Sequence, residues 1–339
     1  MIPRRAQEYY VLGIDGGGTK TLSLLADNTG KVIGRGVGGP SNLHQVNAAE
    51  LRAALRDSLR SALSTGACFP GRLAAVHAGL AGTEAAGGEK RRQVQEIIQE
   101  TLTAILEPAG SSKSAIPVVL TSDIVIALVA GSHARYGLVV ISGTGAVVYG
   151  EGRAGQQAQV SGWGRFIDSD GSGYGIGKAA LRAAFRSYDG RGPHTLLEEL
   201  IVEEWRLNSL RELLQHVLQK EPAVEEIASL AKVVGRAAEA GDQTSVDILT
   251  TTSKQLLEGV LTVARKLNLR EQQFPVVLSG GILSKVDLVA TQLIRGVREQ
   301  LPLANPLRLQ AEPATGAVTL ALEMARNGIC FENTPLGGM

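Results

Sequence analysis

The fold of this chain is decided by the stretch Gly13-Ile14-Asp15-Gly16-Gly17-Gly18-Thr19-Lys20-Thr21. Apolar residues flank it over 9–14 and 21–26, which predicts two strands joined by a tight hairpin, because Asp-Gly turns need a backbone conformation that glycine tolerates. A third strand is expected over 31–36, after a second turn at Asn28-Thr29-Gly30. The chain therefore opens with an antiparallel meander.

The tip of this first hairpin has the composition of a phosphate-binding loop. Successive glycines can direct backbone N–H groups at phosphate oxygens, hydroxyls and a cation add donors, and a carboxylate can hold hydrated Mg²⁺. The residues predicted to bind the nucleotide here are Asp15, Gly17, Gly18, Thr19, Lys20 and Thr21, with Asp15 also the predicted metal ligand. An ordinary Asp-Gly turn is the alternative, and no Walker GxxxxGK[ST] pattern occurs in the chain.

The same pattern begins again in the second half of the chain. Strands are expected over 138–141, 146–150 and 159–162, and the first two are joined by Ser142-Gly143-Thr144-Gly145. Gly143, Thr144 and Gly145 are therefore predicted to be a second phosphate hairpin, with a plain β-turn as the alternative. The repeat predicts an internal duplication of one α/β unit, and the cleft between the halves is the default ligand site.

The other elements follow from hydrophobic periodicity. In the first half, helices are expected over 47–64 and 83–106, strands over 73–77 and 117–121, and a further helix from about 123. In the second half, helices are expected over 195–206, 209–219, 223–240, 245–267 and 284–301, strands over 274–278 and 307–309, and a closing helix over 314–326.

Composition excludes several classes of protein. The 339 residues carry 34 Lys and Arg against 33 Asp and Glu, and aromatic residues make up 4%, so neither a cationic field nor stacking rings for nucleic acid are present. Cys68 and Cys330 lie far apart and form no disulfide framework, which is typical of a reducing compartment. No secretory leader and no apolar run long enough for a membrane is found, so we expect a cytoplasmic protein.

The chain resembles the N-acetylglucosamine kinase and BadF/BadG/BcrA/BcrD-type ATPase group of the ASKHA superfamily (actin, sugar kinases, Hsp70). The motifs that carry the resemblance, besides the two hairpins, are Pro40-Ser41-Asn42, Gly79-Leu80-Ala81-Gly82, Thr121-Ser122-Asp123, Gly162-Trp163-Gly164, Asp170-Gly171-Ser172-Gly173 and Ser279-Gly280-Gly281. The resemblance implies an α/β fold of two RNase-H-like, actin/hexokinase-type domains with an interdomain cleft. The expected domains are residues 1–121 plus 314–330, and residues 122–313 with a helical insertion.

The resemblance also implies roles for single residues. Asp123 matches the general base that accepts the proton of the attacking sugar hydroxyl; the alternative is that Asp123 only caps a helix. Gly280 and Gly281 match a turn that binds adenosine, with an ordinary strand-to-helix turn as the alternative. The residues expected to bind the sugar are Asn42, Gly82, Asp123, Trp163, Gly164 and Asp170. A turn role for Asn42 and core burial for Trp163 are the alternatives.

Two departures from the family pattern concern the substrate. Relatives commonly carry an acid at the position of Ser169, whereas here Asp168 and Asp170 stand on either side of it, and spacing does not say which of them replaces the acid. Ala146-Val147 also follow the second hairpin, where animal N-acetylglucosamine kinases have Ser-Asn. Both changes weaken the expectation of a strict preference for an acetamido group.

The resemblance implies an enzyme that uses ATP and Mg²⁺ to phosphorylate a hexose or amino sugar, most readily N-acetylglucosamine at the 6-hydroxyl. It also implies a homodimer. A broad-specificity hexokinase or glucosamine kinase is one alternative, and an iron–sulfur ATPase activator of a 2-hydroxyacyl-CoA dehydratase-type enzyme, built on Cys68 and Cys330, is another. A non-enzymatic sugar-sensing regulator is a third.

Overall fold

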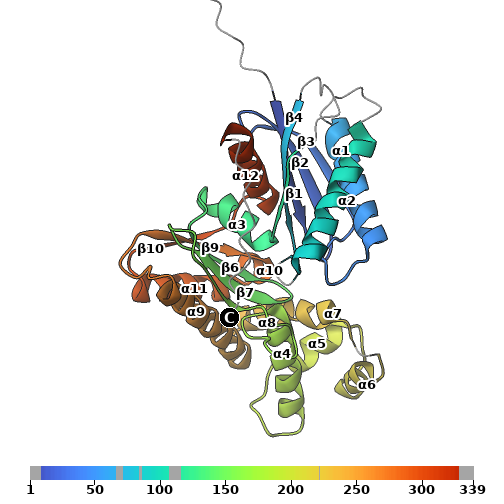
Figure 1. The fold of residues 1–339 in the computed structure, drawn as a ribbon. Helices are drawn as coiled ribbons and strands as arrows, with labels where there is room; N and C mark the ends of the chain where they lie inside the picture. The colour runs from blue at the N-terminus through green and yellow to red at the C-terminus, as the bar shows by residue number, and fades with distance from the viewer. Residues whose placement is uncertain (1–8, 66–71, 84–85, 107–115, 221, 328–339) are drawn as a thin grey trace, which may run out of the picture. The chain divides into compact units, whose positions relative to one another are not determined.

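A computed structural model describes residues 9–65, 72–83, 86–106, 116–220 and 222–327 of the chain (Figure 1). The chain divides into two compact units, the first formed by Met1–Arg135 and Leu309–Met339 and the second by Tyr136–Arg308. Cys68 and Cys330, on which the iron–sulfur alternative depends, lie outside the described residues. Within the described ranges, every helix is too short or too polar to cross a membrane.

The first unit contains a five-stranded sheet in the order β3-β2-β1-β4-β5. Its strands are β1 (Tyr9–Gly16), β2 (Thr21–Asp27), β3 (Val32–Gly38), β4 (Arg72–Leu80) and β5 (Val118–Thr121). β2 is antiparallel to β1 and β3, and β4 is parallel to β1 and β5. The opening meander is therefore confirmed, and the parallel strands end at one common edge.

Helices cover both faces of this sheet (Figure 1). α1 (Ala48–Thr65) and α2 (Gly88–Leu106) lie on one face, and α3 (Asp123–Ser132) and α12 (Pro313–Asn327) pack on the other. The spacing of Leu51, Leu55 and Leu59 places them on a single side of α1, where all are buried against the sheet. The two faces carry separate hydrophobic cores.

The second unit repeats this topology. Its sheet has the strand order β10-β9-β6-β7-β8. This is the order of the corresponding strands in the first sheet, read from the opposite end. The strands are β6 (Gly137–Ser142), β7 (Ala146–Glu151), β8 (Gln157–Ser161), β9 (Phe274–Ser279) and β10 (Ala304–Arg308). Since β6, β7 and β8 form the meander and β9 is parallel to β6, the predicted duplication is confirmed.

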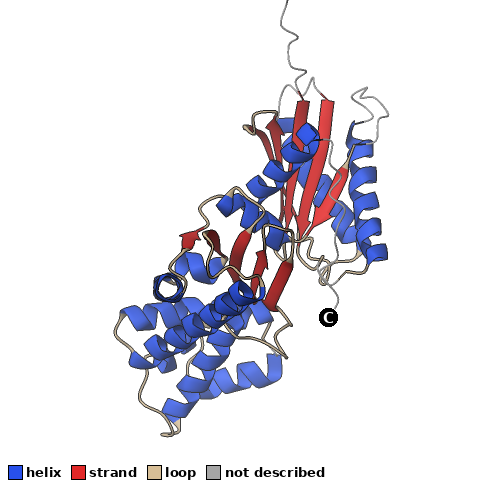
Figure 2. Cartoon of the chain, turned by 60° about the vertical axis from the view of Figure 1, so that its left-hand side comes forward, coloured by secondary structure: helices blue, strands red, loops and turns tan. Residues whose placement is uncertain are grey.

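Most helices of the second unit lie between β8 and β9 in the sequence. Figure 2 shows the helices of this unit gathered beside its sheet. They are α4 (Gly173–Tyr188), α5 (Leu197–Glu204), α6 (Leu210–Lys220), α7 (Val224–Ser229), α8 (Ala231–Glu239) and α9 (Gln243–Lys266), with α10 (Gly281–Lys285) and α11 (Asp287–Gln300) following β9. The sequence did not predict α4, because its start is rich in glycine, a weak helix former. The helices expected over 223–240 and 284–301 are each two helices.

The division between the units also differs from the expected one. It falls after Arg135 rather than after Thr121, because α3 belongs to the first unit. Ile126 and Val129 of α3 pack against Ala317 and Leu320 of α12 in a small core of their own. The apolar contact between these two helices therefore overrides the boundary that the motif order suggested.

Helix α9 is fixed at its start by Asp242, which is the N-cap. The Asp242 carboxylate accepts hydrogen bonds from the backbone N–H of Ser245 (2.9 Å) and from the hydroxyls of Ser245 (2.6 Å) and Thr195 (2.9 Å). Burial raises the pKa of Asp242, but these hydrogen bonds outweigh it and hold the pKa below its ordinary value. The ionised carboxylate therefore joins α9 to the segment before α5.

Asp242→Ala is expected to lower the free energy of unfolding by about 2 kcal/mol at pH 7, since it removes a helix cap and leaves buried donors without an acceptor. Because the folded-state pKa is lowered, the stabilisation is present above the unfolded pKa and is lost as the pH falls below it. Urea denaturation at pH 7 and pH 3 tests both statements. The control is Asp247→Ala on the exposed side of α9, where the lost bond to Gln243 is expected to cost little.

Candidate active site

The candidate site of the first unit lies where its parallel strands end. The strand register pairs Asp15 of β1 with Gly79 of β4, and Gly79 with Thr121 of β5. Neighbouring strands are about 4.8 Å apart, so the backbones of Asp15 and Thr121 are separated by roughly 10 Å. Asp123 follows two residues after Thr121, as the first residue of α3. The sheet therefore brings the carboxylate-bearing residues Asp15 and Asp123 to the same edge.

Backbone hydrogen bonds from the first hairpin attach two more loops to this edge. The carbonyl oxygen of Gly16 accepts the N–H of Ala81 at 2.8 Å. The carbonyl oxygen of Gly17 accepts the N–H groups of Ser41 and Asn42 at 3.0 and 3.1 Å. The loop after β3 and the loop after β4 are thereby held against the hairpin.

Asn42, His44 and Gly82 lie together on these two loops. The side-chain oxygen of Asn42 accepts the N–H of His44 at 3.0 Å, and a Cβ placed on Gly82 would come within 3.1 Å of that oxygen. Asn42 thus has the turn role that was its alternative interpretation. Its half-buried amide also lies beside Gly82, and contact of either residue with a sugar stays a prediction.

The tip of the first hairpin is formed by Gly18, Thr19 and Lys20, which are all exposed. The prediction for Gly17 needs a correction, because its N–H donates to the carbonyl oxygen of Lys20 at 3.1 Å and closes the turn. The N–H that was assigned to phosphate is therefore used within the loop. Gly17 instead stabilises the site through its carbonyl oxygen, which binds the loop after β3.

Thr21 also departs from its predicted role as a phosphate ligand. Its side chain is fully buried, and its hydroxyl donates to the carbonyl oxygen of Gly39 at 2.7 Å and lies 2.8 Å from the hydroxyl oxygen of Ser41. The hydroxyl is therefore committed to the loop after β3. Thr21 therefore stabilises the loop after β3.

Asp15 is a carboxyl group of this edge whose pKa is raised. Burial raises its pKa to about 6; Lys20 opposes the rise and Glu312 adds to it. Glu312, just before α12, is paired with both terminal nitrogens of Arg35. No sequence pattern indicated that Glu312 lies near Asp15, since the two are far apart along the chain.

Asp123 does not cap α3. The N-cap is Ser122, whose hydroxyl oxygen accepts the N–H of Ile124 at 3.1 Å. The interpretation of Asp123 as only a cap is therefore wrong, and its partly buried side chain occupies the first helical position.

His77 supports β5 just before Asp123. Its Nε2 lies 3.0 Å from the hydroxyl oxygen of Thr121, and the ring is almost completely buried. Burial, together with the nearby charge of Arg135, lowers the pKa of His77 to about 3. The imidazole is therefore neutral at physiological pH, and its hydrogen bond to Thr121 connects β4 to β5.

The second hairpin has the same internal closure as the first. The N–H of Gly143 donates to the carbonyl oxygen of Gly145 at 2.9 Å, so this N–H too closes the turn. The carbonyl oxygens of Gly143 and Thr144 accept the N–H groups of Gly173 and Tyr174, at the start of α4, at 2.8 and 3.2 Å. Thr144 and Gly145 are exposed at the tip.

Gly280 and Gly281 lie beside this hairpin, at the carboxyl ends of β6 and β9. The backbone of Gly280 has a φ of +95°, and a Cβ there would lie 2.3 Å from the carbonyl oxygen of Ser142. Glycine is therefore required at this position, both for its conformation and for the close approach. The structure brings Gly143, Thr144, Gly145, Gly280 and Gly281 together in one unit.

Trp163 follows β8 and is 53% exposed. Its alternative interpretation as a core residue is therefore wrong. Phe166 and Ile167, in the same segment, are 86% and 82% exposed. An apolar surface of this kind is typical of a segment that contacts a ligand or another protein, and the predicted contact of Trp163 and Gly164 with a sugar stays a prediction.

Asp168 and Asp170 have different surroundings. Asp168 is partly buried and its carboxylate accepts the N–H of Asp170 at 3.2 Å, whereas Asp170 is exposed. Burial, Asp168 and Glu258 of α9 all raise the pKa of Asp170. Helix α9 therefore adds a third carboxylate to this segment, which the sequence did not indicate.

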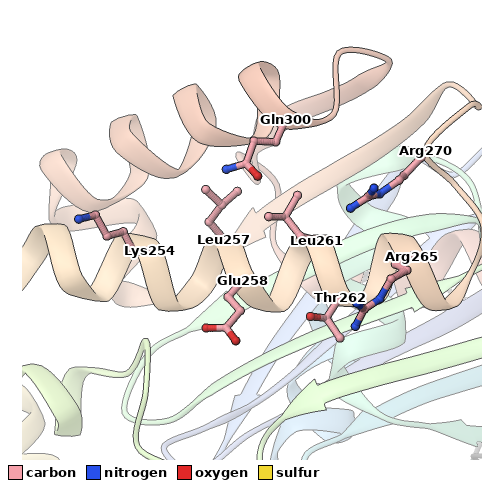
Figure 3. A pocket seen from close by; sticks show the side chains of 8 residues that line it. All are labelled: Lys254, Leu257, Glu258, Leu261, Thr262, Arg265, Arg270 and Gln300. Carbon is pink, nitrogen blue, oxygen red and sulfur yellow. The ribbon is translucent and has the colours of Figure 1, made fainter.

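Figure 3 shows Glu258 on the side of α9 away from Gln300, at a surface hollow of about 430 Å³. The hollow is lined by Lys254, Leu257, Glu258, Leu261, Thr262, Arg265, Arg270 and Gln300. None of the residues predicted for the active site lines it.

The sequence of the chain can now be set beside known families. Residues 12–321 match the family described as the BadF/BadG/BcrA/BcrD ATPase family. The chain belongs to this family. The family that the hairpins and glycine motifs indicated is thereby confirmed.

Several members and neighbours of this ATPase family are similar over almost the whole chain. The N-acetylmuramic acid/N-acetylglucosamine kinase of Clostridium acetobutylicum is 30% identical over 312 residues, covering 92% of this chain and 98% of the relative. The N-acetyl-D-glucosamine kinase of Dictyostelium discoideum is 29% identical, covering 92% and 97%. The structure of a candidate N-acetylglucosamine kinase from Chromobacterium violaceum is 25% identical with a TM-score of 0.68, covering 92% and 98%. The two-sheet α/β fold is the one expected.

Asp15 suits the magnesium ion that ATP-using enzymes of this kind employ. Burial penalises its charge, and a cation would remove that penalty. In the described parts of the chain, no three His, Cys, Asp or Glu side chains gather as a metal-ligand set. A single partly buried carboxylate such as that of Asp15 would suit a Mg²⁺ ion that is otherwise held by water and phosphate oxygens.

Asp15→Asn is expected to raise the melting temperature at pH 8. Because the pKa of Asp15 is raised from 3.8 to about 6, the ionised carboxylate costs stability above pH 6; the cost begins to fall as the pH drops below 6 and disappears only below 3.8. The gain in melting temperature is therefore expected to shrink at pH 5, where the wild-type carboxyl group is largely protonated. Thermal denaturation followed by circular dichroism at the two pH values measures this.

Asp27→Asn, at the far end of β2, is the control and has the opposite expectation. The Asp27 carboxylate accepts hydrogen bonds from the N–H and hydroxyl of Thr29, and the Thr29 side chain is the main reason for its lowered pKa. Its replacement is expected to lower the melting temperature at both pH values. A gain at pH 5 equal to that at pH 8 for Asp15→Asn would contradict the assignment of a buried charge.

Proposed function

We propose that the protein is an ATP-dependent kinase that phosphorylates a hexose or amino sugar, most readily N-acetylglucosamine at its 6-hydroxyl. The observation that carries the proposal is the placement of Asp15 and Asp123 at one edge of one sheet, next to the loops of Asn42 and Gly82. Membership of an ATPase family and the similarity to amino-sugar kinases over 92% of the chain support it.

In this proposal Asp123 is the general base. Its carboxylate accepts the proton of the attacking hydroxyl while the oxygen of that hydroxyl bonds to the terminal phosphorus and ADP leaves. Phosphoryl transfer has a loose transition state, so the base acts mainly by orienting the hydroxyl. Asn42 and Gly82 are proposed to hold the other sugar hydroxyls, because an amide can both donate and accept hydrogen bonds.

The nucleotide is proposed to use the exposed hairpin tips. Gly18, Thr19 and Lys20 of the first unit offer N–H, hydroxyl and ammonium donors to phosphate oxygens, and Thr144 and Gly145 of the second unit offer a hydroxyl and N–H groups. Asp15 would hold Mg²⁺, which supplies positive charge to the phosphates when bound. Gly280 and Gly281 are proposed to accommodate the adenosine, since a turn without side chains leaves space for a base.

Asp123→Asn is expected to lower kcat by roughly 10²- to 10⁴-fold, the usual contribution of a positioned general base. The affinity for ATP should change little. Steady-state ADP release, coupled to NADH oxidation, measures kcat, and isothermal titration measures ATP binding. The control is Ser122→Ala, which removes the N-cap and is expected to lower the melting temperature with a much smaller effect on kcat. Unchanged turnover in Asp123→Asn would refute the assigned base.

A second candidate is a glucosamine or broad-specificity hexose kinase. Burial, Asp168 and Glu258 raise the pKa of Asp170, and a segment with several carboxylates favours a substrate that carries an ammonium group.

A panel of sugars separates these candidates. We expect sugar-dependent ADP release with N-acetylglucosamine, glucosamine, glucose, mannose and N-acetylmuramic acid to be fastest for N-acetylglucosamine. A preference for glucosamine would favour the second candidate, and equal rates would mean that the pocket ignores the substituent at C2. ADP release that needs no sugar would contradict the kinase assignment.

A homodimer in the cytoplasm is also proposed, and sedimentation velocity tests the dimer.

A further inference from the structure

The backbone of Gly171, in the second unit, is held by side chains from two distant elements. Oε1 of Gln255, on α9, accepts the N–H of Gly171 at 3.1 Å. The hydroxyl of Ser142, at the end of β6, donates to the carbonyl oxygen of Gly171 at 2.5 Å. Gly171 is buried, so both of its backbone polar groups are satisfied by the protein.

Gly171 cannot readily be replaced or moved. Its φ is +71°, and a Cβ there would lie 2.4 Å from the side chain of Leu256, the neighbour of Gln255 on α9. Helix α9 therefore contacts Gly171 in two ways, by a hydrogen bond and by close packing. The start of α9 is itself fixed by Asp242, so the position of Gln255 is set by a rigid element.

Gly171 lies in the sequence between two parts of the candidate site. The residues before it, from Trp163 to Asp170, form the segment proposed to contact the sugar. Directly after it, the N–H of Gly173 bonds to the carbonyl oxygen of Gly143 in the phosphate hairpin. The N–H that Gln255 accepts belongs to the peptide plane joining Asp170 to Gly171, so Gln255 sets the orientation of that plane and hence the direction in which Asp170 projects.

We propose that Gln255 is a positioning residue for the sugar, acting through the Asp170–Gly171 peptide. The inference rests on the proposed sugar kinase activity and adds to it a residue outside the glycine motifs. An uncharged amide suits the task, because it accepts the N–H without adding a negative charge beside Asp168, Asp170 and Glu258.

The test compares Gln255→Met with wild type by coupled ADP release. The KM for the sugar is expected to rise roughly tenfold, the effect of losing one partly buried hydrogen bond, while the KM for ATP and kcat change less than twofold. Gln255→Glu keeps an oxygen acceptor of the same reach and is expected to bind the sugar more tightly than Gln255→Met. Hydrogen–deuterium exchange of the peptide that contains Gly171 should be faster in Gln255→Met.

Gln292→Met is the matched control. Gln292 of α11 donates to the hydroxyl of Thr250 on α9 at 3.1 Å, so its loss removes a comparable hydrogen bond from the same helix away from Gly171. It is expected to leave the sugar KM unchanged.

Three results would overturn the inference. An unchanged sugar KM in Gln255→Met is the first, and equal rises in the KM for sugar and ATP, the sign of a merely structural role, are the second. Absence of sugar-dependent ADP release in the wild type is the third; it would overturn the proposed function as well, which distinguishes it from the other two.

Discussion

The carbonyl groups of Gly16 and Gly17 connect the ends of three strands in the first unit. They accept the N–H groups of Ala81, Ser41 and Asn42, so the loops after β3 and β4 are attached to the first hairpin by main-chain hydrogen bonds. Backbone bonds of this kind depend on strand register and are insensitive to side-chain rotation. The backbone of the site is therefore held by the sheet, and this fixes the positions from which its side chains project.

The second unit has the same topology, but different residues occupy the equivalent positions of its first hairpin. The hairpin-end pairs are Gly16 with Thr21 in the first unit and Ser142 with Ala146 in the second, so Asp15 in one corresponds to Ile141 in the other. Only the first copy therefore carries a carboxylate at this position. In the second copy the serine hydroxyl binds Gly171, and the hairpin is used to organise the start of α4.

Burial of charge is a recurring cost at these edges. Asp15 has a pKa of about 6 because it is partly removed from water, and burial keeps His77 of β4 neutral for the same reason. A fold selected only for stability would place apolar residues there. Perturbed groups of this kind gather at functional sites, where a ligand or cation supplies the missing charge.

The sequence by itself determined the two meanders, their duplication and the family, because turns rich in glycine and alternating apolar strands are local features that neighbouring residues specify. It also predicted the two hairpin turns and the helix that begins at Asp123. The tertiary structure alone decided which atoms remain available: it assigned the cap of α3 to Ser122, buried the hydroxyl of Thr21, and used the N–H groups of Gly17 and Gly143 to close turns. It also brought Glu312 near Asp15 and Gln255 onto Gly171. No pattern along the chain marks such pairs, because they arise when elements distant in sequence pack together and satisfy their buried polar groups.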